Sequence, residues 1–147
     1  MMKIFLDTNI LIDYLSRREP FFVPSALLFQ LGKRNKCHLM LSSLSFATAS
    51  FILQAHYKMT HEAVVTLFEK IVELCHITTV DAQTVQNAIA SDFKDFEDAL
   101  QYYSAATVKA DYIITRNKQD FIQSAISVYT PEEFLYNSNN SFTTRNK

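Results

Sequence analysis

The chain has 147 residues, of which 48% are hydrophobic and 20% are charged, and this composition fits one globular domain with a sizeable core. Its formal net charge of −1 argues mildly against a non-specific nucleic-acid binder, because such proteins usually carry a basic excess. The single glycine, Gly32, excludes the glycine-rich loops that hold phosphate in nucleotide-binding proteins.

Short apolar or β-branched runs alternate with segments of helical periodicity. We expect strands at residues 3–7, 38–41, 74–79, 112–115 and 127–130. Between them, apolar residues recur at helical spacing, with Thr60 and Asp81 in N-cap positions and Gly32 just beyond the end of a helix. Short strands separated by helices predict parallel pairing through right-handed crossovers. The expected fold is therefore α/β, a three-layer α/β/α sandwich around a central, mostly parallel five-stranded sheet.

One stretch, residues 37–57, has no Lys, Arg, Asp or Glu and is about long enough to span a bilayer. Ser42 and Ser43 within it predict a helix N-cap that divides a strand from a helix, so we expect no membrane segment. Cys37 and Cys75 lie far apart in apolar segments, and neither has the spacing of a metal ligand. We therefore expect reduced thiols and a cytoplasmic protein.

Acidic and polar residues follow the first predicted strand. Asp7, Thr8 and Asn9 stand at its carboxyl end, the edge at which open α/β sheets place their ligands. The same residue types are good helix N-caps, and without further evidence capping is the commoner explanation. Asp7 is therefore a candidate for both roles.

Two further polar clusters come later in the chain. Asp95, Glu97 and Asp98 open a predicted helix, where carboxylates also suit the positive end of the helix dipole. Asn117 and Asp120 follow the fourth predicted strand. If all these clusters meet at one sheet edge, like-charge repulsion requires a divalent cation among them. Oxygen ligands without histidine or cysteine favour Mg²⁺ or Mn²⁺.

Three segments, taken together, resemble the best-marked segments of PIN-domain nucleases. They are FLDTNILID at residues 5–13, DFEDALQ at 95–101 and ITRNKQDF at 114–121. Each is weak alone, but their order and separations extend the resemblance over residues 1–136. It implies a PIN-like parallel sheet flanked by helices, with a carboxylate pocket that binds Mg²⁺ or Mn²⁺ and hydrolyses RNA phosphodiesters. Many compact bacterial members are VapC-like toxins, each paired with a small antitoxin protein.

The resemblance also implies roles for particular residues. Asp7 matches the first metal-binding aspartate of the family, and Asn9 matches the polar residue beside it. Asp98 matches the acidic residue at the start of a later helix. Thr115 is implied to line the pocket after the fourth strand.

The chain departs from the family pattern at two positions. The family usually has a glutamate in the helix after the second strand, where this chain has Thr48. The fourth acid of the family would align with Asn117, which leaves Asp120, one helical turn later, as its substitute. Glu97 and Asp95 both remain open as replacements for the missing glutamate. These departures resemble a sub-branch whose last motif reads RN-x-x-D-F.

The implied mechanism is metal-assisted hydrolysis of an RNA substrate, with Asp7, Asp98 and Asp120 as the metal ligands. Arg116 and Lys118 lie beside the same edge and are candidates for contacts with the RNA backbone, although a solvated basic turn explains them equally well. We also expect a homodimer, since aromatic residues at 20–24 and 134–136 could serve dimerisation or antitoxin docking. Burial in the core is the commoner explanation for these aromatic residues.

Two other functions are open at this stage. Thr48 and Asn117 could leave too few carboxylates, and the chain would then be a catalytically weakened PIN-like protein that binds RNA or a partner. A phosphotransfer enzyme or receiver domain also places an aspartate after a parallel strand, but a haloacid-dehalogenase-type site requires aspartate at the position of Asn9. We expect a nuclease domain over residues 1–136 and a polar, mobile tail over residues 137–147.

Overall fold

A computed structural model of the protein describes residues 1–145, with side chains described for residues 1–138. The strands are β1 (Lys3–Leu6), β2 (His38–Ser42), β3 (Cys75–Thr78), β4 (Tyr112–Ile114) and β5 (Ser127–Tyr129). The helices are α1 (Thr8–Ser16), α2 (Phe22–Lys33), α3 (Ser43–Ala55), α4 (His61–Leu74), α5 (Ala82–Ile89), α6 (Phe96–Thr107) and α7 (Pro131–Arg145), with a 3₁₀ helix, η1, at Lys118–Phe121. Each predicted strand is present, within one residue of its expected ends.

The five strands form one sheet in the order β3-β2-β1-β4-β5. Every neighbouring pair is parallel, so the prediction of a mostly parallel five-stranded sheet is confirmed. β1 lies at the centre, and the chain moves outward from it to one side through β2 and β3 and to the other through β4 and β5. The strand order therefore reverses at β1, and open α/β sheets bind ligands beyond the carboxyl ends of the strands at such a point.

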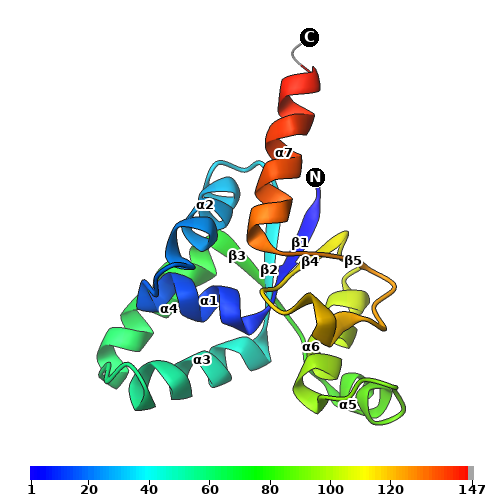
Figure 1. Cartoon of the computed structure of the whole chain (residues 1–147). Coiled ribbons are helices and arrows are strands. Elements are labelled where there is room, and N and C mark those ends of the chain that lie inside the picture. The colour runs from blue at the N-terminus through cyan, green and yellow to red at the C-terminus, as the bar shows by residue number, and fades with distance from the viewer. Residues whose placement is uncertain (146–147) are drawn as a thin grey trace.

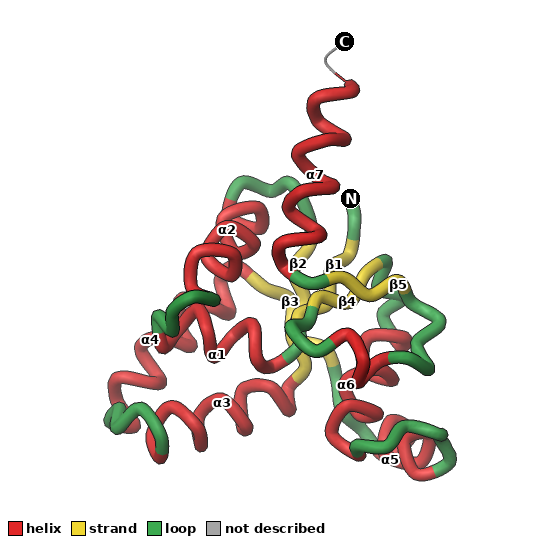
Figure 2. The backbone as a smooth tube through the Cα atoms, viewed as in Figure 1, coloured by secondary structure: helices red, strands yellow, loops and turns green. Residues whose placement is uncertain are grey.

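Helices cover both faces of the sheet, as the alternation of side chains along β1 requires. Ile4 and Leu6 point into the larger core, which they share with residues of α1–α4 and with Phe134 of α7. Phe5 points the other way, into a second core completed by Ala105 of α6. Figure 1 shows α1–α4 to the left of the sheet and α5 and α6 at its lower right. In Figure 2 the yellow strands lie between these two groups of helices, which confirms the three-layer sandwich.

The polar residues expected to begin helices do so. Asp7, Ser42, Thr60 and Asp81 are the N-caps of α1, α3, α4 and α5, and the side chain of each accepts a hydrogen bond from a backbone N–H of its helix. The Ser42 cap divides the uncharged stretch between β2 and α3, as predicted. No helix formed by the described residues has the length and apolar character that a bilayer crossing requires.

Gly32 differs from expectation, because it lies inside α2 rather than beyond its end. The helix continues to Lys33, and Asn35 provides the left-handed backbone conformation after it, with φ of 55°. A Cβ on Gly32 would lie 2.5 Å from Cδ1 of Leu39, which is buried in β2. The glycine thus allows α2 to approach the sheet closely. Its role is therefore in tertiary packing, which the preference of glycine for helix ends does not predict.

The C-terminal segment begins differently from the polar tail that we expected at residue 137. α7 starts at Pro131 and continues as helix as far as Arg145, so most of residues 137–147 belongs to a helix that begins in the folded domain. Phe134 anchors its first turn in the larger core, where it is 4% exposed. The mobility of this segment stays a prediction, and residues 146 and 147 lie outside the described residues.

The register of the sheet brings polar residues from three strands to one edge. Leu6 is paired with Ile114, so Asp7 and Thr115, the next residues, lie side by side at the carboxyl ends of β1 and β4. The N–H of Asp7 donates to the carbonyl of Ile114 at 2.9 Å, which continues the ladder by one step. Ser42 ends β2 on the other side of β1. This edge is where a ligand site is expected.

Candidate active site

Asp7 lies at the centre of the carboxyl edge and is 7% exposed. Its Oδ1 accepts a hydrogen bond from the N–H of Thr8 at 2.8 Å, and its Oδ2 accepts one from the hydroxyl of Thr115 at 2.8 Å. Burial raises the pKa of the Asp7 carboxyl above its ordinary value, and these hydrogen bonds offset only part of that effect. The carboxylate is therefore fixed in place by neutral groups, none of which balances its charge.

Asn9 and Asn117 complete the polar surroundings of Asp7. The Nδ2 of Asn9 donates to Oδ2 of Asp7 at 3.2 Å and to the hydroxyl oxygen of Thr115 at 3.4 Å. The backbone N–H of Asn117 donates to the same hydroxyl oxygen at 3.1 Å. The structure thus brings together Asp7, Asn9 and Thr115. The Oδ1 of Asn9 is buried, and no group among the described residues donates a hydrogen bond to it.

Asp98 comes from the first turn of α6, on the second core's side of the sheet. Burial, the largest cause, and nearby negative charges together raise the pKa of the Asp98 carboxyl to about 7. The negative charges are those of Asp7, Asp95, Asp120 and Glu97. Acidic residues from segments far apart in sequence therefore act on the same carboxyl group, that of Asp98.

Asp95 and Glu97, the two alternatives for the missing glutamate, have different surroundings. Asp95 is the N-cap of α6, and its Oδ1 accepts a hydrogen bond from the backbone N–H of Asp98 at 2.9 Å. The Oε1 of Glu97 instead accepts a hydrogen bond from the hydroxyl of Thr48 at 3.1 Å. The negative charge of Glu97 raises the pKa of Asp7 and that of Asp98. Helix α3 thus holds, through a threonine, a carboxylate that α6 supplies.

Asp120 is exposed on η1, and its backbone N–H donates to the carbonyl of Asn117 at 3.0 Å. Its negative charge contributes to the raised pKa of Asp98. Within residues 1–138, however, no three side chains of His, Cys, Asp or Glu lie close enough to share a metal ion. The expected convergence of Asp7, Asp98 and Asp120 on one ion is therefore incomplete in this structure.

Arg116 and Lys118, the predicted RNA contacts, both form ion pairs within the chain. The Nε of Arg116 donates to Oδ2 of Asp13 at 2.6 Å, and the guanidinium lies 4.2 Å from the ring centroid of Phe21. Lys118 pairs with Glu133 at 3.1 Å, and both side chains are 44% exposed. Arg116 is thus held against α1 and the start of α2, whereas Lys118 remains accessible to a ligand.

A residue that the sequence pattern did not single out, Gln101, lies one turn after Asp98 in α6 and is 1% exposed. Its amide hydrogen-bonds with the hydroxyl groups of Thr8, Ser42 and Ser45. The sequence held one signal for this role. Gln101 is a polar residue three positions after Asp98, on a helix face otherwise expected to pack on the sheet. This network links α6 to α1 and α3 next to Asp7.

Neither cysteine belongs to the acidic edge. Both are buried free thiols, and burial raises the pKa of Cys37 to about 11 and that of Cys75 to about 12. Thiols with such pKa values remain protonated near neutral pH and are poor nucleophiles. The reduced state of both thiols stays a prediction.

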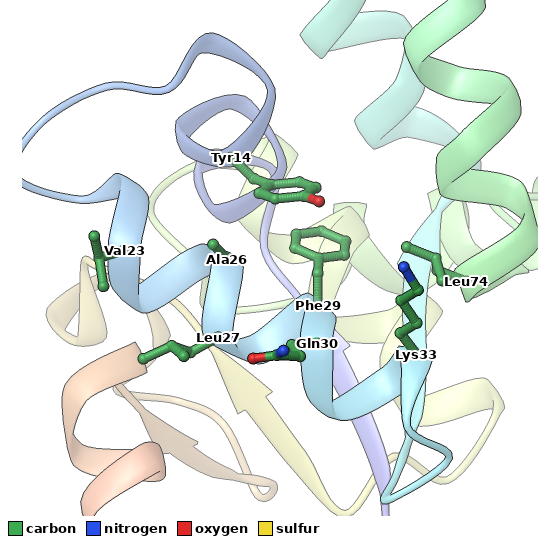
Figure 3. A pocket seen from close by; sticks show the side chains of 8 residues that line it. All are labelled: Tyr14, Val23, Ala26, Leu27, Phe29, Gln30, Lys33 and Leu74. Carbon is green, nitrogen blue, oxygen red and sulfur yellow. The ribbon is translucent and has the colours of Figure 1, made fainter.

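A cavity of about 340 Å³ lies away from the acidic edge, against α2 (Figure 3). Figure 3 shows the ring of Tyr14 above that of Phe29, with Val23 and Leu27 nearer the start of α2. Val23 and Leu27 are 54% and 44% exposed. The full lining is Tyr14, Val23, Ala26, Leu27, Phe29, Gln30, Lys33 and Leu74. It contains no carboxylate, so it offers none of the ligands that a hard cation prefers.

The arrangement is that of an α/β protein with an acidic site at the carboxyl edge of a parallel sheet. Residues 3–119 match the PIN domain family, and the chain belongs to that family. The resemblance found in the sequence is thereby confirmed.

Several characterised proteins are similar to this chain. Ribonuclease VapC1 of Aquifex aeolicus (strain VF5) is 28% identical over 137 residues, which cover 90% of this chain and 92% of that protein. VapBC2 of Rickettsia felis, solved with a DNA fragment from its promoter, has a TM-score of 0.62 at 16% identity, covering 88% of this chain and 98% of that one. Mycobacterium tuberculosis VapC20, a sarcin-ricin loop cleaving toxin, has a TM-score of 0.58 at 15% identity, covering 75% and 86%. At these identities the solved structures support the fold.

Proposed function

We propose that this protein is a metal-dependent endoribonuclease that hydrolyses RNA phosphodiester bonds, and that it is the toxin of a toxin–antitoxin pair. The observation that carries the proposal is that the charges of four other carboxylates, from β1, α6 and η1, act together on Asp98 near the carboxyl edge of the sheet. A metal ion placed among them would relieve their repulsion. The similarity to a ribonuclease over nearly the whole chain supports RNA as the substrate.

The groups at this edge fit a hard divalent cation. All the candidate donors are oxygen atoms, and Mg²⁺ is usually bound through one or two carboxylates while it keeps several water ligands. Asp7 and Asp98 therefore suffice as direct ligands, and Asp120 would complete the shell through water. The buried, unpaired Oδ1 of Asn9 is a further oxygen in this region. Mg²⁺ or Mn²⁺ bound here would activate water and stabilise negative charge on the phosphate.

The remaining residues position the ligands. Thr115 and Asn9 hold Asp7 through hydrogen bonds to its Oδ2, and the Thr8 N–H bonds to Oδ1, which leaves one lone pair of Oδ1 free. We assign to Glu97 the role of the missing glutamate, because Thr48 holds it whereas Asp95 is used as a helix cap. Lys118 is the candidate contact for the RNA backbone, and Arg116 retains a lesser part in that role because it is paired with Asp13.

Cleavage of RNA by the purified protein tests the proposal. We expect Mn²⁺- or Mg²⁺-dependent cleavage of structured RNA, loss of cleavage in EDTA, and no cleavage by Asp7→Asn or Asp98→Asn. Isothermal titration of Mn²⁺ should show binding to the wild type and none to either variant. A fully active Asp98→Asn variant would refute the assignment of the site.

A compensating exchange tests the role of Glu97. Glu97→Gln should weaken Mn²⁺ binding about tenfold, since supporting groups of metal sites contribute on that scale. The double variant Thr48→Glu/Glu97→Gln returns the carboxylate to α3 and should restore binding. Asp95→Asn is the control, because asparagine still caps a helix. Unchanged Mn²⁺ affinity in Glu97→Gln would remove Glu97 from the site.

The proposed partners are RNA, a small antitoxin protein and a second copy of this chain. Solved relatives include a toxin–antitoxin complex from Klebsiella pneumoniae, with a TM-score of 0.62 over 87% of this chain, which supports an antitoxin. We expect the protein to act in the cytoplasm. Light scattering of the purified chain tests the homodimer, and a monomer at micromolar concentration would contradict it.

One observation favours a second function, a PIN-like binding protein without catalysis. Three metal-binding side chains do not gather within the described residues. This alternative predicts no bound Mn²⁺ at millimolar concentration and RNA binding that is insensitive to EDTA. The two functions are therefore separated by the same titration.

A further inference from the structure

The side-chain amide of Gln101 forms hydrogen bonds with hydroxyl groups from two other helices and a strand. Its Nε2 donates to Oγ1 of Thr8 at 2.6 Å and to Oγ of Ser45 at 2.8 Å, and its Oε1 accepts from the hydroxyl of Ser42. Thr8 and Ser45 also lie 2.8 Å apart through their hydroxyl oxygens. All four residues are at most 7% exposed, so the network is closed to water.

Gln101 connects the two carboxylates of the acidic edge without touching solvent. At one end it holds Thr8, whose N–H donates to Oδ1 of Asp7 at 2.8 Å. At the other end it belongs to α6, three residues after Asp98, and residues at this spacing share a helix face. One side chain thus fixes the start of α6 relative to the end of β1.

The network opposes a specific force. Asp7 and Asp98 carry like charges in a partly desolvated place, and their repulsion favours movement of α6 away from α1. A lysine or arginine could hold them together, but it would neutralise the carboxylates and compete with a cation for them. The neutral amide holds the helices and leaves the negative charge available.

We propose that Gln101 is a positioning residue of the metal site, which fixes Asp98 opposite Asp7 through its buried contacts with Thr8, Ser42 and Ser45. The assignment rests on the proposed function, since the positioned groups are the proposed metal ligands. Gln101 itself binds neither metal nor RNA. It acts through the placement of α6.

Gln101→Met tests this role, because methionine fills a similar volume and makes no comparable hydrogen bond. The hydroxyl groups of Thr8 and Ser45 can still pair with each other, so the variant should fold. We expect Mn²⁺ affinity to fall about tenfold or more, as for other groups that orient metal ligands. Hydrogen exchange of the Ala99 amide, which bonds to the Asp95 carbonyl in the first turn of α6, should become faster than in the wild type, even without metal.

Ser104→Ala is the matched control. Ser104 is equally buried, lies one turn later in α6 and bonds to the Thr78 hydroxyl at 2.6 Å and the Thr79 carbonyl at 2.8 Å. The Ser104→Ala variant should be less stable than the wild type, while its Mn²⁺ affinity and the hydrogen-exchange rate of the Ala99 amide stay unchanged. A merely structural role for Gln101 predicts that the two variants behave alike, and that result overturns the proposal.

A second pair of variants protects the test against misfolding of Gln101→Met. Thr8→Val removes the hydroxyl with little change of shape and should weaken Mn²⁺ binding, whereas Thr8→Ser should retain wild-type affinity. Equal affinity of Thr8→Val and Thr8→Ser also overturns the proposal. If the wild type itself binds no Mn²⁺, the proposed function fails, and the exchange rate at Ala99 alone decides whether Gln101 fixes α6.

Discussion

Replacing Asp98 by asparagine should make the metal-free protein more stable at pH 8 while removing a ligand of the proposed metal site. The pKa of Asp98 is about 7 in the folded protein, against an ordinary value of 3.8. The folded state therefore binds more protons than the unfolded state between these values, and its stability falls as the pH rises through this window. The loss of folding stability that ionised Asp98 causes is fully present above pH 7 and nearly absent at pH 4.

The size of the effect follows from the shift of the Asp98 pKa. About 3 units at about 1.4 kcal/mol each give an upper bound of about 4 kcal/mol. The carboxyl group is only half buried, so solvent screening reduces this to about 2 kcal/mol. The loss of a favourable charge in the first turn of α6 offsets about 0.5 kcal/mol. Asp98→Asn should therefore gain about 1.5 kcal/mol at pH 8 and little at pH 4.

Urea unfolding in EDTA at the two pH values measures this difference, with Asp92→Asn as the control. Asp92 is an exposed acid before α6 and is not one of the four carboxylates that chiefly raise the pKa of Asp98, so its replacement should show no such pH dependence. Mn²⁺ at one hundred times its Kd should stabilise the wild type by about 2.7 kcal/mol and reverse the order of the two proteins. An Asp98→Asn variant that is less stable than wild type at pH 8, or equally shifted at both pH values, would refute the reasoning.

Three further perturbations follow from the structure. Arg116→Met should destabilise the protein by about 3 kcal/mol in urea unfolding, because it leaves the buried Asp13 carboxylate unpaired. Adding Asp13→Asn should recover most of the loss. Unchanged stability of Arg116→Met would contradict a stabilising role of this ion pair. Gly32→Ala should cost about 1 kcal/mol despite its better helix propensity, and less in a Leu39→Val background, whereas a gain in stability would contradict the close approach to β2. Lys118→Ala should change stability by less than about 0.5 kcal/mol but raise the KM for RNA cleavage several-fold at low salt; an unchanged KM would exclude it from the RNA surface.

The strands could be predicted because their signal is local. The buried runs of β1 and β4 are short, apolar and bounded by polar residues, so their length and their place between helices identify parallel strands. The caps at Ser42, Thr60 and Asp81 were equally readable, since each side chain bonds to its own helix. Local chemistry accounts for these features completely.

Other features depend on contacts between distant segments. Gly32 was misassigned because a glycine near the end of a helical pattern fits both a helix terminus and a close helix–sheet contact, and the contact with Leu39 decides between them. The sequence around Arg116 suggests a free basic residue, because its partner Asp13 is more than one hundred residues away and meets it only in the folded protein. Gln101 lies among residues that pack on the sheet, and nothing local marks its three hydroxyl partners.

The acidic edge illustrates how a site can keep its charge while its residues change places. A carboxylate needs to reach the metal from a suitable direction, but the helix that supplies it is not fixed by the chemistry. In this chain α3 contributes the hydroxyl of Thr48, which donates to Glu97 of α6, and under the proposed function Glu97 supplies the carboxylate that the family usually carries on α3. Such an exchange is tolerable only if α6 is held firmly against α1 and α3, because Glu97 and Asp98 then depend on the placement of a single helix turn. The buried amide of Gln101, one turn later, meets that requirement without adding a positive charge.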